Sequence, residues 1–132
     1  MLPDKPTVIL DVAHNPQAAR SLADNLCAQY VSGKTYAVFG MLRDKDIAAV
    51  ITPLKDQIDI WWVGGLTGPR GASGEQLAAL LHDKDISAVH VAADITQAYT
   101  FACRQAGEND RICVFGSFYT VAEVLIARGA KA

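Results

Sequence analysis

The stretch Thr7-Val-Ile-Leu-Asp-Val-Ala-His-Asn-Pro16 decides the fold class of this chain. Its apolar part predicts a buried strand over Thr7–Leu10, and Asn15-Pro16 then sets a capping side chain before a proline, which is typical of a helix start. The ionisable residues Asp11 and His14 therefore lie between a strand end and a helix N-terminus. Ligands bind at that edge of open α/β sheets, and the helix end favours anions.

Further along the chain, apolar runs continue to alternate with helical patterns. The runs are short and continuous, as expected for strands that are covered on both faces. The predicted strands are Thr7–Leu10, Thr35–Phe39, Ile58–Val63, Ala88–Val91 and Arg111–Phe115. This alternation predicts a three-layer, Rossmann-like α/β domain, with a mainly parallel sheet of about five to six strands and helices on both faces.

Apolar residues at helical spacing predict the first four helices. The stripes are Ala19, Leu22, Ala23, Leu26, Cys27 and Tyr30; Ile47, Val50, Ile51 and Leu54, with Pro53 near the helix end; Leu77, Leu80 and Leu81; and Ile95, Ala98, Tyr99, Ala102, Cys103 and Ala106.

Several polar residues are typical of helix ends. Ser73-x-x-Gln76 predicts a capping box, and Asp44 and Asp94 are interpreted as ordinary caps. A fifth helix opens at Ser117 or at Thr120, where Thr120-x-x-Glu123 is a second capping-box match, and Gly129 is a plausible stop.

The composition excludes several classes of protein. The 132 residues form one domain, and a net charge of −2 without a basic stripe argues against nucleic-acid or anionic membrane partners. No apolar run approaches a membrane span, and Met1–Pro6 lacks the apolar core of a signal peptide. We therefore expect a cytoplasmic protein.

The cysteines and two of the histidines receive structural interpretations. Cys27, Cys103 and Cys113 occupy core-like positions and are expected to be buried free thiols, with no disulfide and no metal site. His82 and His90 have no chemical context and are expected to be structural or exposed.

The polar, glycine-marked segments all follow predicted strands. They comprise residues 11–16, 40–46, 64–73 and 116–120. In a parallel sheet these loops share one edge, so the side chains that they carry can converge from distant parts of the sequence. The converging candidates are Asp11, His14, Lys45, Arg70 and Ser117.

Each candidate also has a simpler interpretation. Asn15 and Ser117 could be only caps, and Lys45 in an Asp-Lys-Asp run could be a solvated charge. His14 is balanced between a structural and a functional role. The chain lacks a triphosphate-binding P-loop, a dinucleotide fingerprint, a nucleophile elbow with a base, and metal-ligand spacing. These residues therefore supply only part of an active site.

Four motifs in order resemble a known family. They are Ile9-Leu-Asp-Val-Ala-His-Asn-Pro16, Gly40-Met-Leu-Arg-Asp-Lys-Asp46, Gly68-Pro-Arg-Gly-Ala-Ser73 and Val114-Phe-Gly-Ser-Phe-Tyr-Thr-Val-Ala-Glu-Val124. The chain resembles the C-terminal domain of the folylpolyglutamate synthase/dihydrofolate synthase branch of the Mur ligase superfamily, over nearly its whole length.

The resemblance implies an ATP-dependent ligase of folate biosynthesis and one-carbon metabolism. Such an enzyme adds L-glutamate to dihydropteroate and to tetrahydrofolate through an acyl phosphate. In the family, ATP and Mg²⁺ are held mostly by an N-terminal ATPase domain. We expect residues 1–132 to be a single C-terminal, glutamate-ligase domain that lacks this ATPase partner and is inactive in isolation.

The resemblance also implies roles for individual residues. Asp11 would accept hydrogen bonds from the ATP ribose, and His14 and Asn15 would lie near the phosphate or the incoming glutamate. Lys45 would pair with one glutamate carboxylate, and Ser117 would hold the other.

Three further positions complete the set implied by the resemblance. The backbone N–H of Phe118 would assist Ser117, and Arg70 is a candidate anion contact from its motif position. The family more often has His where this chain has Tyr119, so the role of that position stays open.

Two other functions remain possible from the sequence. One is a cell-wall ligase of the same superfamily, although Gly116-Ser-Phe-Tyr-Thr-Val-Ala122 and Gly68–Ser73 argue against it. The other is a free-standing, non-catalytic module that binds a nucleotide or an amino acid, which would fit the incomplete catalytic set.

Overall fold

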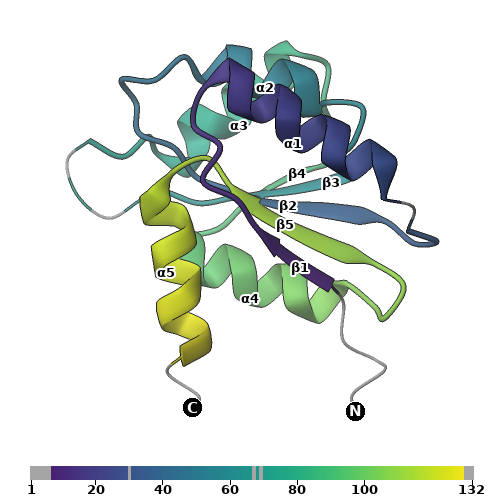
Figure 1. Cartoon of the computed structure of the whole chain (residues 1–132). Helices are drawn as coiled ribbons and strands as arrows, with labels where there is room; N and C mark the ends of the chain where they lie inside the picture. The colour runs from purple at the N-terminus through teal and green to yellow at the C-terminus, as the bar shows by residue number, and fades with distance from the viewer. Residues whose placement is uncertain (1–6, 30, 67, 69, 130–132) are drawn as a thin grey trace.

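A computed structural model describes residues 7–29, 31–66, 68 and 70–129 of the chain. Strands and helices alternate along it, as the apolar runs predict (Figure 1). The elements are β1 (Thr7–Leu10), α1 (Pro16–Ala28), β2 (Thr35–Phe39), α2 (Ile47–Leu54), β3 (Ile60–Val63), α3 (Gly74–Asp83), β4 (Val89–Val91), α4 (Ile95–Gln105), β5 (Arg111–Phe115) and α5 (Phe118–Gly129).

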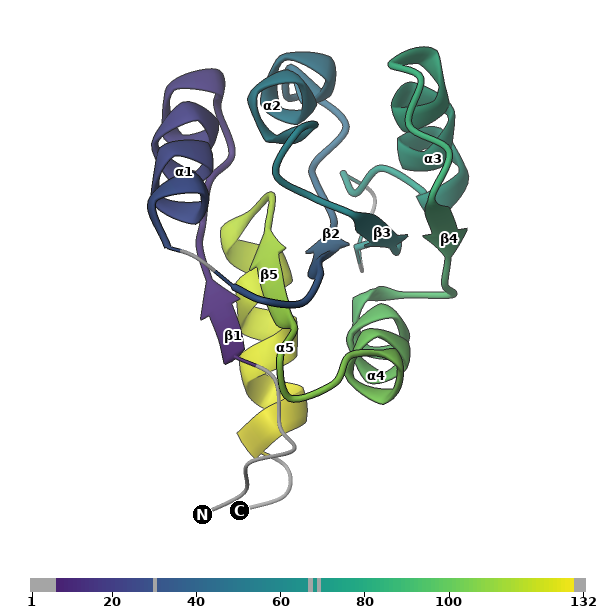
Figure 2. The ribbon, with the colours of Figure 1, turned by 90° about the vertical axis from the view of Figure 1, so that its right-hand side faces the viewer.

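The five strands form one sheet in the order β1-β5-β2-β3-β4, and every neighbouring pair is parallel. The last strand in the sequence therefore lies between the first two. Helices α1, α2 and α3 cover one face of the sheet, and α4 and α5 cover the other (Figure 2). This arrangement confirms the predicted three-layer α/β fold.

Side chains that alternate along the central strands fill a core on each face of the sheet. On the face of α1, α2 and α3, Phe39 packs against Phe115 with ring centroids 4.9 Å apart. Trp61 meets the rings of Phe39 and Phe115 edge-on at 5.5 and 5.9 Å. Because these three rings come from three adjacent strands, their packing fixes how the strands lie beside one another.

Two predicted strands are slightly shorter than expected. β3 begins at Ile60, not Ile58, and β4 begins at Val89, not Ala88. Just before β3, the Asp59 carboxylate accepts a hydrogen bond from the Thr35 N–H at 2.8 Å. Ile58 is buried although it lies outside the ladder, so its apolar character extended the predicted strand too far.

One predicted helix start is wrong, and for α5, which begins at Phe118, the Ser117 alternative is confirmed and the Thr120 alternative is not. Asp46, not Asp44, caps α2 and accepts a hydrogen bond from the Ala49 N–H at 3.2 Å. Thr120 lies inside α5, and its hydroxyl donates to the Gly40 carbonyl at 2.7 Å, so it forms no capping box with Glu123.

The remaining helix signals agree closely with the structure. Ser73 and Gln76 form the predicted capping box, and Asp94 caps α4. The apolar stripes face the cores, and Pro53 lies in the last turn of α2. Gly129 is the last residue of α5, and Tyr30 lies outside the described residues.

The cysteines are free, but they are not all buried. Cys113 is buried, Cys103 is half-buried and Cys27 is exposed, which corrects the expectation for Cys27. Successive helical residues are about 100° apart, so Cys27 falls at the edge of the stripe that Leu26 continues into the core. Burial, followed by the nearby Asp11 charge, raises the pKa of Cys113 to about 12.

Two expectations about the surface can also be checked. His82 and His90 are exposed, and the His90 ring stacks on Trp62 with centroids 4.6 Å apart. No helix within the described residues is long and apolar enough to cross a membrane.

Arg111 joins three elements at the end of the sheet opposite to the strand-end loops. It is only 7% exposed. Its guanidinium donates to the Thr35 hydroxyl at 2.7 Å and to the carbonyls of Gln29 at 2.7 Å and Leu26 at 2.9 Å. These bonds satisfy carbonyl groups at the C-terminus of α1 while holding them against β2 and β5.

We predict that Arg111→Met lowers the free energy of unfolding by about 3 kcal/mol, because two buried acceptors and one half-buried acceptor lose a charged donor. Urea denaturation of the purified chain measures this loss. The control is Arg20→Met on the exposed face of α1, which should change stability by less than about 0.5 kcal/mol. Equal stabilities of the two variants would contradict this role for Arg111.

Candidate functional site

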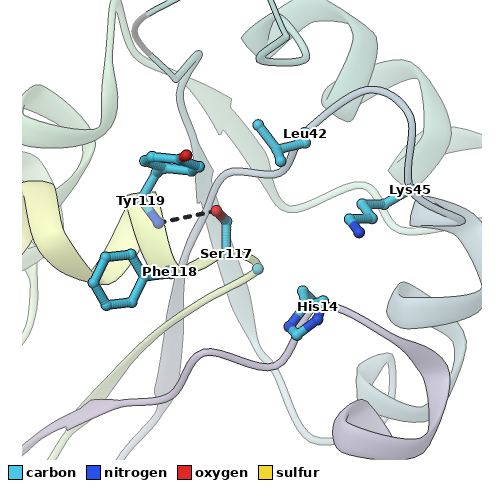
Figure 3. A pocket seen from close by; sticks show the side chains of 7 residues that line it. His14, Leu42, Lys45, Ser117, Phe118 and Tyr119 are labelled. Atoms are coloured by element: carbon cyan, nitrogen blue, oxygen red, sulfur yellow. Dashed lines mark hydrogen bonds between the residues drawn. The ribbon is translucent and has the colours of Figure 1, made fainter.

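A pocket of about 170 Å³ opens at the carboxyl ends of the strands (Figure 3). Its walls come from the loops that follow β1 and β2 and from the turn between β5 and α5. The lining residues are His14, Leu42, Lys45, Gly116, Ser117, Phe118 and Tyr119. Four of the predicted site residues therefore converge here: His14, Lys45, Ser117 and Phe118.

The strand order explains this convergence. Because β5 lies between β1 and β2, the turn that carries Ser117 has the loops of His14 and Lys45 on its two sides. The loop that follows β3 is one strand farther away. The sheet thus brings together residues from both ends of the chain and from its first third.

Ser117 is the most buried polar group of the pocket, at 4% exposed. It caps α5: its carbonyl accepts from the Val121 N–H at 3.3 Å, and its Oγ accepts from the Tyr119 N–H at 3.0 Å. The hydroxyl proton is not used in that bond, so it can be donated to an anion in the pocket. The positive end of the α5 dipole acts in the same direction.

His14 is exposed, and its ring is oriented by a local hydrogen bond. Nδ1 lies 2.9 Å from the Val12 carbonyl oxygen. Because a carbonyl can only accept, this contact assigns the ring proton to Nδ1 and leaves Nε2 of the neutral ring as an acceptor. His14 can therefore accept a proton or a hydrogen bond in the pocket, and in its protonated form it can donate one.

Lys45 supplies a cationic side chain to the pocket. Figure 3 shows it extending from the loop after β2 toward the space beside His14 and Ser117. The Lys45 N–H donates to the Leu42 carbonyl at 3.3 Å, which makes the loop a tight turn. An ammonium group offers three donors, so the pocket as a whole is suited to a carboxylate or a phosphate.

Asp11 and Asn15 do not line this pocket. The Asp11 carboxylate is half-buried and accepts from the Ala13 N–H at 2.8 Å. The Asn15 side chain caps α1 by accepting from the Ala18 N–H at 2.8 Å. Both residues lie on the same connection as His14, and both shape the turn that presents it.

Arg70 does not join the predicted cluster either. It is exposed and makes a 2.6 Å salt bridge to Asp44, which is a partner that the sequence analysis treated as a cap. Hydrogen bonding to Arg70 lowers the pKa of Asp44, so both groups are charged at neutral pH. Arg70 follows β3, which lies beyond β2 in the sheet order, and it does not line the pocket.

The sequence did not predict the contacts of Gly116 and Thr120 with the end of β2, which fix the turn that carries Ser117. Gly116 has φ of +118°, and a Cβ there would overlap the Gly40 carbonyl oxygen. Thr120 donates its hydroxyl to that same carbonyl at 2.7 Å. The glycines at the two strand ends were the available signal, since a close backbone approach requires them.

The described residues contain no group of three or more His, Cys, Asp or Glu side chains arranged to hold a metal ion.

Comparison with known proteins identifies the family to which the chain belongs. Residues 2–118 match the family described as Mur ligase, glutamate ligase domain. The dihydrofolate synthase/folylpolyglutamate synthase of Escherichia coli is 43% identical over 123 residues, which are 92% of this chain and 28% of that protein. The chain thus spans little more than a quarter of that curated relative.

Solved structures of relatives share the fold. The bifunctional folylpolyglutamate synthase/dihydrofolate synthase described with Mn, AMPPNP and L-glutamate bound superposes with a TM-score of 0.86 at 45% identity, covering 94% of this chain and 29% of that chain. An E. coli enzyme in complex with DHPP and ADP superposes with a TM-score of 0.86 at 41% identity, covering 94% of this chain and 29% of that chain.

We predict that Gly116→Ala destabilises the fold by about 2–4 kcal/mol, because it adds both a strained φ and a steric overlap with Gly40. Thermal unfolding of the purified variants measures the loss. Gly68→Ala is the matched control, since Gly68 has φ of +104° but open space around its Cβ position. A Gly116→Ala loss no larger than that of Gly68→Ala would contradict the close approach.

Proposed function

Because the chain belongs to the Mur ligase family as a glutamate ligase domain, we propose that it is the C-terminal domain of an ATP-dependent ligase. The ligase adds L-glutamate to dihydropteroate and to tetrahydrofolate in folate biosynthesis. The observation that carries this proposal is the pocket in which Lys45, His14 and Ser117 meet at the strand ends. An acidic amino acid offers the anionic groups that such donors recognise.

In this proposal a separate ATPase domain supplies the phosphate loop and holds Mg²⁺. The described residues contain no group of three or more His, Cys, Asp or Glu side chains that could hold a metal ion. Magnesium neutralises phosphate charge when bound in such enzymes. The present domain contributes binding and orientation of the amino acid, and in isolation it does not turn over.

Lys45 and Ser117 hold the carboxylates of the incoming glutamate. The Lys45 ammonium pairs with one carboxylate, and the Ser117 hydroxyl with the Phe118 N–H donates to the other. Phe118 is 69% exposed at the rim, so its side chain is available to contact a second domain or the acceptor substrate. Arg70 pairs with Asp44 and does not line the pocket, so we give it no direct contact with the glutamate.

Residues of the β1–α1 connection face the nucleotide. Asp11 accepts one N–H at a single oxygen, which leaves lone pairs for the ribose hydroxyls of ATP. His14 lines the pocket and would lie near the phosphate and the attacking amine. Asn15 fixes the start of α1, whose N-terminal N–H groups favour the same anions.

The reaction joins an amine to a carboxylate that ATP has activated as an acyl phosphate. Holding the amine beside that carbon is chiefly a positioning task, and positioning alone supplies ~7–11 kcal/mol of barrier reduction in favourable cases. Closure of this domain on its ATPase partner would also exclude water, which otherwise hydrolyses the acyl phosphate.

We place the enzyme in the cytoplasm. Its three cysteines are free thiols, including the exposed Cys27, as expected in a reducing compartment. The acceptor and nucleotide substrates of the proposed reaction are small, soluble metabolites.

The test is glutamate addition by the full-length polypeptide that contains this chain, followed by mass spectrometry of the products. With Mg-ATP and L-glutamate, we expect both dihydropteroate and tetrahydrofolate to gain one glutamate residue. Ser117→Ala should raise the KM for glutamate roughly tenfold or more, because a donor to a charged group is lost.

Ser73→Ala is the matched control. It removes the same type of helix cap from α3, which lies outside the pocket, and should change the KM by less than about twofold. Equal effects of the two variants would overturn the assignment of Ser117. Addition of an amino acid to a muramoyl acceptor alone would identify a cell-wall ligase. A gene product no longer than this chain would favour a binding module.

A further inference from the structure

The loop after β3 braces the loop that carries Lys45. Leu42 and Gly71 form an isolated antiparallel bridge between the two loops. On one side of it the Arg43 N–H donates to the Arg70 carbonyl at 2.8 Å, and on the other the Ala72 N–H donates to the Met41 carbonyl at 2.9 Å. The two connections are therefore a single ribbon at the edge of the pocket.

The Asp44–Arg70 salt bridge lies at the end of this ribbon. Its oxygen and nitrogen are 2.6 Å apart, and the side chains remain 52% and 63% exposed. Asp44 is the residue immediately before Lys45, and Asp46, immediately after it, caps α2. Lys45 is thus held between an anchored helix start and a side chain tied to the neighbouring loop.

We propose that Asp44 and Arg70 are positioning residues that hold Lys45 toward the pocket and so set its affinity for the incoming amino acid's carboxylate. This inference rests on the proposed ligase function, and it assigns Arg70 a role through Lys45 in place of direct contact with substrate. Neither residue lines the pocket, whereas Lys45 and Leu42 of the same ribbon do.

The charges of the ribbon agree with a positioning role for Asp44 and Arg70 and a binding role for Lys45. Asp44 neutralises the charge of the Arg70 guanidinium. Of the two loops, it is therefore Lys45 that presents a positive charge to the pocket. If the salt bridge were absent, Asp44 would be a free carboxylate adjacent to Lys45 and could pair with its ammonium. The salt bridge therefore pairs the Asp44 carboxylate with Arg70 and not with the Lys45 ammonium.

The test is a charge exchange in the full-length ligase, with the KM for L-glutamate and kcat measured separately. We expect Asp44→Arg and Arg70→Asp each to raise the KM roughly fivefold, because an exposed attraction becomes a repulsion, with kcat little changed. The double variant, with the charges exchanged, should restore the KM to within about twofold of the wild-type value.

Arg43→Asp is the matched control for the change in net charge. Arg43 is exposed on the same ribbon, and its backbone already makes the ribbon hydrogen bond. Combined with Asp44→Arg, it should fail to restore the KM. Restoration by Arg43→Asp would show that only the overall charge matters and would overturn the positioning role.

Asp44→Asn separates positioning from direct contact without a charge reversal. Positioning predicts a higher KM for glutamate, whereas a substrate-binding Arg70, once released from Asp44, would give an unchanged or lower KM. If the wild-type enzyme adds glutamate and the KM for glutamate is unchanged in all variants, this inference is overturned but the proposed function is not. No glutamate addition by the wild-type enzyme overturns the proposed function, and this inference with it.

Discussion

The close approach of the β5–α5 turn to the end of β2 is the constraint on which the pocket depends. It requires a residue without a side chain at Gly116, and Thr120 secures it by donating its hydroxyl to the Gly40 carbonyl. Ser117 lies between these two residues and is therefore fixed next to the loop of Lys45. The insertion of β5 between β1 and β2 then places His14 on the other side.

Much of the fold could be predicted because its signals are local. Continuous apolar runs and the Ser73 capping box depend on neighbouring residues alone, and they agree with the structure. The pairing of Arg70 with Asp44 is not local, so the sequence could not show that Arg70 makes this salt bridge and does not line the pocket. Cys27 was misjudged because it lies one position from the buried Leu26, and Asp44 because it lies two positions before Asp46, which caps α2.

The site combines rigid and exposed parts in a way that suits a shared active centre. Ser117 is buried and tied into α5, whereas His14, Lys45 and Phe118 are exposed at the rim. The rigid part can orient a small amino acid, and the exposed part can meet groups supplied by another domain. This division follows from the position of the pocket at the sheet edge, where loops are supported by strands below and open to solvent above.

The most direct measurement is a crystal structure of the full-length polypeptide that contains this chain, the proposed ligase, with L-glutamate and a non-hydrolysable ATP analogue. Our account predicts one glutamate carboxylate within about 3.2 Å of the Lys45 ammonium and the other within the same distance of the Ser117 hydroxyl. Glutamate bound elsewhere, with the pocket between His14, Lys45 and Ser117 holding no ligand, would contradict it.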